Sequence, residues 1–539
     1  MTLKPPKPTF TIRQLNQIQA LIITNPQPHI LNPLLKTLTQ SSNPQNAFLI
    51  YNQMLHHPLA YNHYTFTHAL QACTLTHTHQ KGFEIHASVI KCGHLHDLFI
   101  QNSLIHFYCV TKNDIFSAHQ IFNSILYPDV VSWTTIISGL SKCGFFREAI
   151  DMFAAMNVKP NCNTLVSVIS ACFGLRSLKF GKAIHGYSFR NFHEDNVILD
   201  NAVLDFYVRR GPPESARHLF VKMPKRDVVS WTTMIGGYVQ RGFCEEAVRV
   251  FQEMLQTKET EPNDATLVNV LSACSSISAL SLGQSVHSYI NSRNGFWVSN
   301  LVGNALINMY VKCGEMGMAI QVFNMLKDKD IISSSTVISG LAMNGYGKQA
   351  LQLFSLMIVN WVRPDDITFT GLLSACSHGG MVDQGLMIFK AMSVYKIVPQ
   401  AQHYACMVDM YGRAGHLEEA EAFIREMPCE ADGPVCGALL NACRIHGNEK
   451  MFERIMQKLI NMKGVSAGTF ALVTNTYASA DRWEDVNKVR KDIRSMRLKK
   501  KAGCSWIEVN TLIPEDRSEN RACKILTAKG YMKSRENKF

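Results

Sequence analysis

Regularly spaced histidines are the first candidates for chemistry in this sequence, because imidazole nitrogens bind metals and transfer protons. His86, His185 and His287 recur about 100 residues apart. That spacing is typical of one position copied in a repeated unit, so we predict core or rim histidines and no metal site. Residues 345–350 (GYGKQA) fit a dinucleotide-binding pattern. They follow a predicted helix instead of a strand, so we interpret them as a turn.

The sixteen cysteines are the second candidates. Four of them follow an alanine at equivalent positions: Cys73, Cys172, Cys274 and Cys376. A buried thiol packs as a small hydrophobic group, whereas a disulfide framework belongs to small secreted proteins. We therefore predict buried free thiols, a reducing compartment and no cofactor.

Any functional side chain in this chain must be positioned by a helical hairpin, which is clearest at residues 228–263. Apolar residues in its first half follow helical spacing, and Gly242 supplies a turn. Glu245 and Glu246 favour the start of a second helix, and Pro262 marks its end. Two such helices cannot bury their apolar faces alone, so neighbouring copies must cover them.

The hairpin recurs along most of the chain. Residues 130–153 repeat it nearly residue for residue, and residues 331–354 repeat it more loosely. One small residue in each second helix sets a period of 31 to 36 residues. These small residues are Ala47, Gly82, Ala118, Ala149, Gly181, Ala216, Ala247, Gly283, Ala319, Ala350, Gly385 and Ala420. The order alanine, glycine, alanine recurs four times, so the sequence predicts a helical solenoid built from triplets of hairpins.

Composition narrows the class of partner. The net charge of +12 and the pI near 8.9 favour an anionic partner.

No window approaches 18 consecutive apolar residues, so we predict no membrane span. No acidic residue precedes Glu84, which is typical of organelle import signals, although Arg13 is the only arginine before Arg147.

The repeats resemble the plant pentatricopeptide repeat family, in the class that alternates standard, long and short repeats. VVSWTTMIGGYVQRGFCEEAVRVFQEM resembles the standard type, LVNVLSACSSISALSLGQSVH the long type and GNALINMYVKCGEMGMAIQVF the short type. The resemblance implies an all-α, right-handed superhelical α-solenoid of about 12 repeats over residues 28–432. Residues 433–510 resemble the extension motifs of the family's editing subgroups. Residues 1–27 form an N-terminal segment with a partial repeat, and residues 511–539 form a polar tail.

The resemblance implies that each repeat reads one base of single-stranded RNA through a few side chains. In the family the discriminating pair is the fifth and the last residue of a repeat. The implied pairs are Asn32 with Asn62, Asn102 with Asp129, Thr134 with Asn161, Asn201 with Asp227, Thr232 with Asn263, Asn304 with Asp330, and Ser335 with Asp365. The family's rule then gives the target Y-n-U-A-n-U-A-n-U-G-n-n. Val166 and Val268 of two long repeats cannot hydrogen-bond a base. A polar residue at any one of these positions can also serve only as a helix cap.

The related editing proteins often end in a zinc deaminase with an H-x-E and a C-x-x-C motif. His416-Leu417-Glu418 matches the first motif formally, but His416 follows a turn glycine and Asp432 stands where the second motif needs cysteine. No C-x-x-C occurs in the sequence. We therefore expect no catalytic residues and no enzymatic activity.

The resemblance implies an organelle site-recognition factor for C-to-U editing, which recruits a deaminase or other editing-complex protein through residues 433–510. A mitochondrion is the expected compartment, with a chloroplast as the alternative. Three rival interpretations remain at this stage. They are an RNA stabilisation, splicing or processing factor of the same fold, a protein-binding scaffold like the tetratricopeptide repeats, and a decayed gene product.

Overall fold

The computed structural model describes residues 28–41, 43–55, 61–112, 114–192, 196–257, 259–294, 299–428, 430–460, 467–479, 481–495, 506–508 and 531–533. The N-terminal segment 1–27 lies outside the described residues. The chain divides into two compact units, Met1–Gly237 and Tyr238–Phe539, and each is considered by itself.

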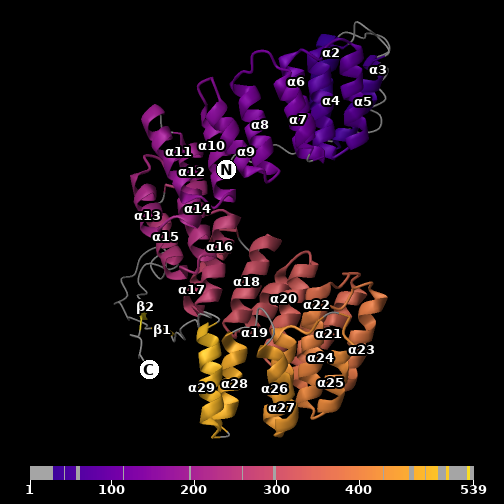
Figure 1. The fold of residues 1–539 in the computed structure, drawn as a ribbon, viewed down its shortest axis with the longest axis vertical. Helices are drawn as coiled ribbons and strands as arrows, with labels where there is room; N and C mark the ends of the chain where they lie inside the picture. The colour runs from indigo at the N-terminus through magenta and orange to yellow at the C-terminus, as the bar shows by residue number, and fades with distance from the viewer. Residues whose placement is uncertain are drawn as a thin grey trace. The chain divides into compact units, whose positions relative to one another are not determined.

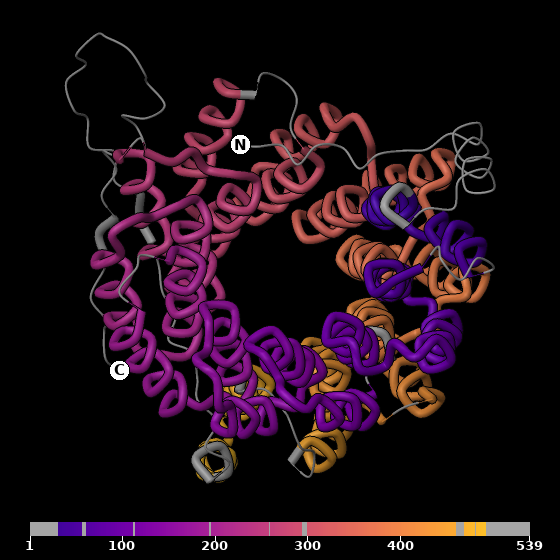
Figure 2. The backbone as a smooth tube through the Cα atoms, turned by 90° about the horizontal axis from the view of Figure 1, so that it is seen from above, coloured from indigo at the N-terminus to yellow at the C-terminus, as the bar shows by residue number. Residues whose placement is uncertain are grey.

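The first unit consists of helical hairpins (Figure 1). Its helices are α2 (Pro28–Thr39), α3 (Ala47–Leu55), α4 (His63–Thr76), α5 (His79–Lys91), α6 (Leu98–Phe107), α7 (Ile115–Asn123), α8 (Val130–Lys142), α9 (Phe146–Ala155), α10 (Cys162–Gly174), α11 (Leu178–Asn191), α12 (Val197–Arg210), α13 (Pro213–Lys222) and most of α14 (Val228–Gln240), with the short turns η1 (Pro44–Asn46) and η2 (Tyr108–Lys112). The first helix of a repeat packs against the first helix of the next repeat, as α4, α6, α8 and α10 do in succession. Each also packs against its own second helix, so this unit has two layers of helices (Figure 2).

The second unit continues the same pattern. Its helices are α15 (Cys244–Thr257), α16 (Asp264–Ser276), α17 (Leu280–Asn294), α18 (Asn300–Lys312), α19 (Met316–Met325), α20 (Ile331–Met343), α21 (Gly347–Val359), α22 (Asp366–Gly379), α23 (Val382–Val394), α24 (Ala401–Arg413), α25 (Leu417–Arg425), α26 (Gly433–His446), α27 (Glu449–Ile460), α28 (Ala467–Ser479) and α29 (Trp483–Ser495). The strands β1 (Trp506–Glu508) and β2 (Tyr531–Lys533) pair antiparallel. The predicted all-α solenoid is confirmed, and this small strand pair is an addition that the sequence did not suggest.

Small residues in the second helices allow close approach between neighbouring hairpins. The alanines of the periodic set, such as Ala149, are fully buried. A Cβ atom on Gly82 or Gly181 would overlap the ring of Phe107 or Phe206 in the following repeat. Each long repeat therefore needs a glycine because a large side chain from the next first helix occupies the space of a Cβ.

The three recurrent histidines lie at the same interface between long and short repeats. The Nδ1 atoms of His86, His185 and His287 lie 2.7, 3.1 and 2.9 Å from a tyrosine hydroxyl in the following first helix. Burial lowers the pKa of all three imidazoles. The prediction of core or rim histidines is confirmed.

The cysteines after alanine are buried in the first helices of the long repeats. Burial raises the pKa of the Cys73, Cys172 and Cys376 thiols to about 11, so they are protonated and inert at neutral pH. They act as small hydrophobic groups, as the sequence indicated.

The predicted short repeat 98–129 carries an extra residue in its first half. Its first residue lies 20 positions before Ala118, whereas the first residues of short repeats 197–227, 300–330 and 401–432 lie 19 positions before Ala216, Ala319 and Ala420. The first helix of repeat 98–129 ends in a π-helical turn, Tyr108–Lys112, which accommodates one additional residue without shifting the rest of the hairpin. The Cys143 thiol of the next repeat donates to the carbonyl oxygen of Cys109 at 3.0 Å.

One buried apolar cluster joins the last repeat to the extension. It begins at Tyr404 and includes Leu439, Phe470 and Val489. The extension helices α26 to α29 therefore share their core with the repeats. Of the described helices, none is long and apolar enough to cross a membrane.

Candidate nucleic-acid interface

The last residue of each predicted reading repeat caps the first helix of the next repeat. The side chains of Asn62, Asp129, Asn161, Asn263, Asp330 and Asp365 each accept from a backbone N–H in the first turn of that helix. Asp227 Oδ1 accepts from Ser230 N at 2.9 Å in the same way. The capping role is therefore real at all seven positions. A cap uses only part of a side chain's hydrogen-bonding capacity, so it leaves room for a second role.

Four of the seven pairs are joined directly by a hydrogen bond between the fifth and the last residue. Asn32 Nδ2 donates to Asn62 Oδ1 at 2.8 Å, and Asn201 Nδ2 donates to Asp227 Oδ1 at 3.1 Å. The distance from Asn304 Nδ2 to Asp330 Oδ2 is 3.4 Å, and that from Ser335 Oγ to Asp365 Oδ1 is also 3.4 Å. Within each unit, residues 26 to 30 positions apart in the chain are thus brought together near the starts of first helices.

The remaining three pairs differ. Thr134 Oγ1 lies 2.7 Å from Thr164 Oγ1, which lies 2.9 Å from Asn161 Oδ1, so the Thr164 hydroxyl contacts both members of this pair. Within the described residues, the buried Oδ1 atom of Asn102 has no hydrogen-bond partner, although Asp129 caps the adjacent helix.

The seventh pair divides between the two units. Thr232 Oγ1 donates to Val228 O at 2.7 Å in the first unit. Asn263 Oδ1 accepts from Thr266 N at 2.9 Å in the second unit.

A buried hydroxyl supports most of these pairs. It belongs to the third residue of the first helix that the last residue caps. These residues are Thr65, Ser132, Thr164, Ser230, Thr266, Ser333 and Thr368, and all have 0% exposure. Sequence reasoning missed this row, although the recurrence of serine or threonine three residues after Asn or Asp is visible in the printed sequence.

Asp227 illustrates the electrostatics of the capping position. Burial by itself would raise the pKa of the Asp227 carboxyl. Hydrogen bonds from Ser230, Asn201 and the Val229 backbone outweigh burial, so the pKa is lowered overall. The side chain is therefore a carboxylate at neutral pH and can accept, but not donate, a hydrogen bond.

A row of exposed apolar side chains accompanies the polar pairs. Each occupies the second position of a repeat and is between 49% and 68% exposed. They are Tyr64, Phe99, Val131, Ile198, Val229, Leu301, Ile332 and Ile367. None of these residues was predicted from the sequence. Their signal is an apolar residue directly after the first residue of a helix, at a position that faces solvent.

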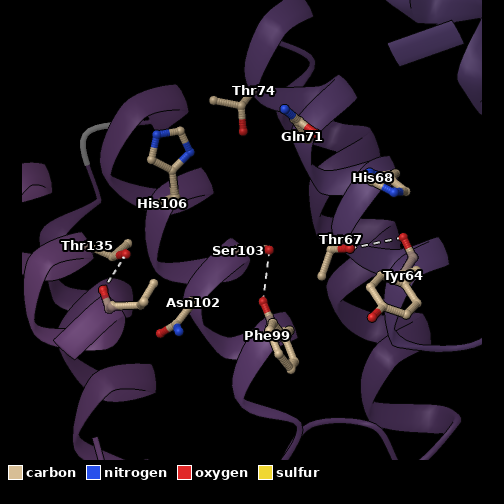
Figure 3. A pocket seen from close by; sticks show the side chains of 11 residues that line it. Tyr64, Thr67, His68, Gln71, Thr74, Phe99, Asn102, Ser103, His106 and Thr135 are labelled. Carbon is tan, nitrogen blue, oxygen red and sulfur yellow. Dashed lines mark hydrogen bonds between the residues drawn. The ribbon is translucent and has the colours of Figure 1, made fainter. Parts of the chain in front are cut away.

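A pocket of about 420 Å³ opens where three successive first helices of the first unit meet. Its lining includes Tyr64, Phe99 and Asn102, as well as His68 and His106 (Figure 3). The hydroxyls of two lining residues, Thr67 and Ser103, are bonded to the carbonyl oxygens of Tyr64 and Phe99 at 3.0 and 2.9 Å. Aromatic walls beside polar groups suit a flat heteroaromatic ring. Thr67 is the fifth residue of a long repeat and was not among the predicted reading residues.

The valines at the fifth position of two long repeats, Val166 and Val268, are half-buried. His416 lies before helix α25, with its Nδ1 atom 3.6 Å from Glu419. It is therefore part of a repeat turn, as expected. The described part of the chain brings no three His, Cys, Asp or Glu side chains together as a metal site would require.

Comparison with protein families gives consistent matches along the chain. The model of the PPR repeat family matches residues 128–174, 226–276 and 329–378. A second model, PPR repeat, matches residues 201–228, 304–331, 367–397 and 403–430. The E motif model matches residues 446–508.

Individual proteins show the same relationship. A chloroplastic pentatricopeptide repeat-containing protein of Arabidopsis thaliana is 37% identical over 530 residues, which cover 92% of this chain and 71% of the relative. A mitochondrial pentatricopeptide repeat-containing protein of the same plant is 36% identical over 453 residues, with 83% and 71% covered. The crystal structure of a pentatricopeptide repeat protein from maize matches with a TM-score of 0.58 and 17% identity, over 91% of this chain and 77% of the maize chain. The similarity to the maize structure supports the fold alone.

Proposed function

The chain belongs to the pentatricopeptide repeat family and carries an E motif, and on this premise we propose that it binds single-stranded RNA of an organelle and selects a cytidine for C-to-U editing. The observation that carries the RNA-binding proposal is the pattern of hydrogen bonds at the fifth and last residues. These bonds leave sets of donors and acceptors that complement the edges of particular unpaired bases.

The Asn201–Asp227 pair complements uracil. Asp227 Oδ1 accepts from Ser230 and from Asn201, which leaves Oδ2 as the acceptor for a ligand. Asn201 Oδ1 accepts from the Ser230 hydroxyl at 2.6 Å, and the second N–H of Asn201 Nδ2 is the donor for a ligand. Uracil offers a donor at N3 and an acceptor at O4, so one base fits both atoms. Cytosine has an acceptor at N3, which a carboxylate repels.

The Thr134–Asn161 pair complements adenine. Asn161 Oδ1 accepts from Thr164 N at 2.9 Å, so the Asn161 amide nitrogen is the group left to donate. Thr134 Oγ1 donates to the Val130 carbonyl at 2.7 Å and accepts from the Thr164 hydroxyl, so its remaining lone pair can accept from a ligand. Adenine accepts at N1 and donates from its 6-amino group, which matches this order.

Two further pairs follow the same logic. Asn62 Oδ1 is engaged by Asn32 Nδ2, so Asn62 presents its amide nitrogen, which suits the N3 acceptor of cytosine. Asp365 Oδ1 accepts from Thr368 N at 2.8 Å, so its other oxygen remains for the N1 and 2-amino donors of guanine beside Ser335. These assignments support the target Y-n-U-A-n-U-A-n-U-G-n-n.

The exposed apolar side chains at the second position of their repeats contribute a second kind of contact to RNA binding. An apolar or aromatic side chain beside each polar pair can contact the face of a base while the pair bonds its edge. Since every base has such a face, this row contributes affinity without selecting a base. A net hydrogen bond contributes only about 1 kcal/mol, so selectivity must accumulate over several repeats.

For the editing role, we propose that residues 433–510 recruit a deaminase or another editing-complex protein. The E motif match and the core shared by the extension and the last repeat support this assignment. Trp483 at the start of α29 is 56% exposed, and exposed tryptophan is typical of protein interfaces. We propose that this chain itself supplies no catalytic residue.

We also propose a location in an organelle, with the mitochondrion ahead of the chloroplast. A fluorescent fusion of the full chain, imaged with markers for both organelles, tests this. Signal confined to the cytosol would contradict it.

Removal of the protein followed by sequencing of organelle transcripts tests the editing role. At least one cytidine should lose editing, and it should lie near a match to the target. If every cytidine is still edited while a transcript loses stability or splicing, the processing role is correct instead. A gel shift with the target RNA and a scrambled control tests RNA binding itself, and equal failure on both RNAs would favour a protein-binding scaffold.

A further inference from the structure

The buried hydroxyl row does more than cap helices. At two repeats the hydroxyl donates to the amide oxygen of the fifth residue: Thr65 Oγ1 to Asn32 Oδ1 at 2.8 Å, and Ser230 Oγ to Asn201 Oδ1 at 2.6 Å. Ser230 Oγ also lies 2.9 Å from Asp227 Oδ1 and accepts from Asp227 N at 3.2 Å. This hydroxyl therefore contacts both members of the pair proposed to read the base.

We propose that Ser230 and Thr65 are positioning residues that fix base selection by locking the amide orientation of Asn201 and Asn32. This inference rests on the proposed RNA-binding function. An asparagine amide can turn by 180° and exchange its donor and acceptor at little intrinsic cost. With the hydroxyl donating to Oδ1 and the last residue accepting from Nδ2, only one orientation satisfies both neighbours.

The lock matters most for the choice between the two pyrimidines. In the locked orientation Asn201 presents an N–H to the ligand, which suits O4 of uracil. In the turned orientation it presents Oδ1, which suits the 4-amino group of cytosine. Loss of the hydroxyl removes the group that holds Oδ1 inward, so the uracil preference of repeat 197–227 should weaken while its helix stays capped by Asp227 Oδ1 and the Ser230 backbone.

The chain contains a matched control. Ser132 occupies the same helical position as Ser230, has 0% exposure as well, and follows another Asn–Asp pair. Its hydroxyl donates to Asp129 Oδ1 at 2.8 Å. The described residues include no partner for Asn102 Oδ1, so Ser132 does not lock that amide. Removing the Ser132 hydroxyl costs a similar buried hydrogen bond without releasing a locked asparagine.

The experiment compares full-length Ser230→Ala, Ser230→Thr and Ser132→Ala with the unmodified chain. Fluorescence anisotropy measures Kd for the target RNA and for two single-base variants, with cytosine in place of the uracil opposite repeat 197–227 or repeat 98–129. S230A should lower the uracil-to-cytosine affinity ratio at its own repeat by about 3- to 10-fold, the equivalent of one neutral hydrogen bond. S230T restores a hydroxyl and should keep the uracil-to-cytosine affinity ratio at repeat 197–227. S132A should keep the corresponding ratio at repeat 98–129.

Circular dichroism melting establishes that each variant is folded. If S230A fails to fold, Thr65→Ala with Thr65→Ser as its rescue tests the same lock opposite Asn32, where T65A should change the ratio of affinities for the two pyrimidines and T65S should keep it. The lock is refuted if S230A retains the full ratio, or if S132A loses the ratio at its repeat to the same extent. Equal affinity of the unmodified chain for target and scrambled RNA would instead refute the proposed function, and the lock with it.

Discussion

Replacing Asp227 with asparagine should change the base preferred by repeat 197–227 from uracil to cytosine. Asparagine caps helices about as well as aspartate, so Oδ1 of the new side chain can still accept from Ser230 N, as Asp227 Oδ1 does at 2.9 Å. The group presented to the ligand changes from a carboxylate oxygen to an amide N–H. That N–H can donate to N3 of cytosine but opposes the N3–H of uracil.

The expected change in affinity follows from the loss of the hydrogen bond between uracil N3–H and the Asp227 carboxylate. A hydrogen bond to a charged group contributes about 1.5 to 3 kcal/mol. At 1.4 kcal/mol for each factor of ten, Asp227→Asn should reduce affinity for the uracil RNA by about 10- to 150-fold. Affinity for the RNA with cytosine at that position should rise. Because hydrogen bonds lower the pKa of Asp227, the unmodified chain should keep its uracil preference down to about pH 5.

Fluorescence anisotropy with two RNAs that differ at this one base measures the effect. Asp330→Asn is the control, because it should alter the preference at repeat 300–330 and leave that at 197–227 unchanged. If Asp227→Asn lowers affinity equally for both RNAs, or leaves the uracil preference intact, then the carboxylate does not read the base and the assignment is refuted.

Three further outcomes are expected. Gly181→Ala should destabilise the fold by about 1 to 3 kcal/mol, because the new Cβ overlaps the Phe206 ring. A Cβ on Gly186 in the same helix would have no atom within 4 Å, so Gly186→Ala should stabilise the fold by about 0.5 to 1 kcal/mol. Urea unfolding of both variants measures these changes. Burial lowers the pKa of His185, so the unfolded chain takes up a proton that the folded chain resists, and stability should fall as pH drops below about 6.5. His185→Phe should make that pH dependence shallower in thermal melts while lowering stability at pH 8, and an unchanged slope would contradict it. Ile198→Ser removes an exposed apolar contact that buries roughly 40 Å² against a base, worth about 1 kcal/mol, so anisotropy should show weaker binding to every RNA with unchanged base ratios.

The sequence by itself determined the architecture, because each repeat is a local unit whose helices, turn and cap lie within about 35 residues. Helical spacing placed the hairpins, and the period of small residues identified the interfaces between them. The glycines of the long repeats and the histidines about 100 residues apart had the structural roles that their spacing indicated. The seven pairs came from the family resemblance, and the sequence could not say whether the two members of a pair touch.

Tertiary structure decided the chemistry of the candidate site. The contacts of Asn201 with Asp227 and Ser230 join residues 26 and 29 positions apart, and they form only when successive first helices stack. Which oxygen of a carboxylate is engaged, which way an amide is turned, and where a hydroxyl is buried all depend on that stacking. The π-helical turn at Tyr108–Lys112 also depends on stacking, because it lies at the end of its first helix and packs against the first helices of both neighbouring repeats.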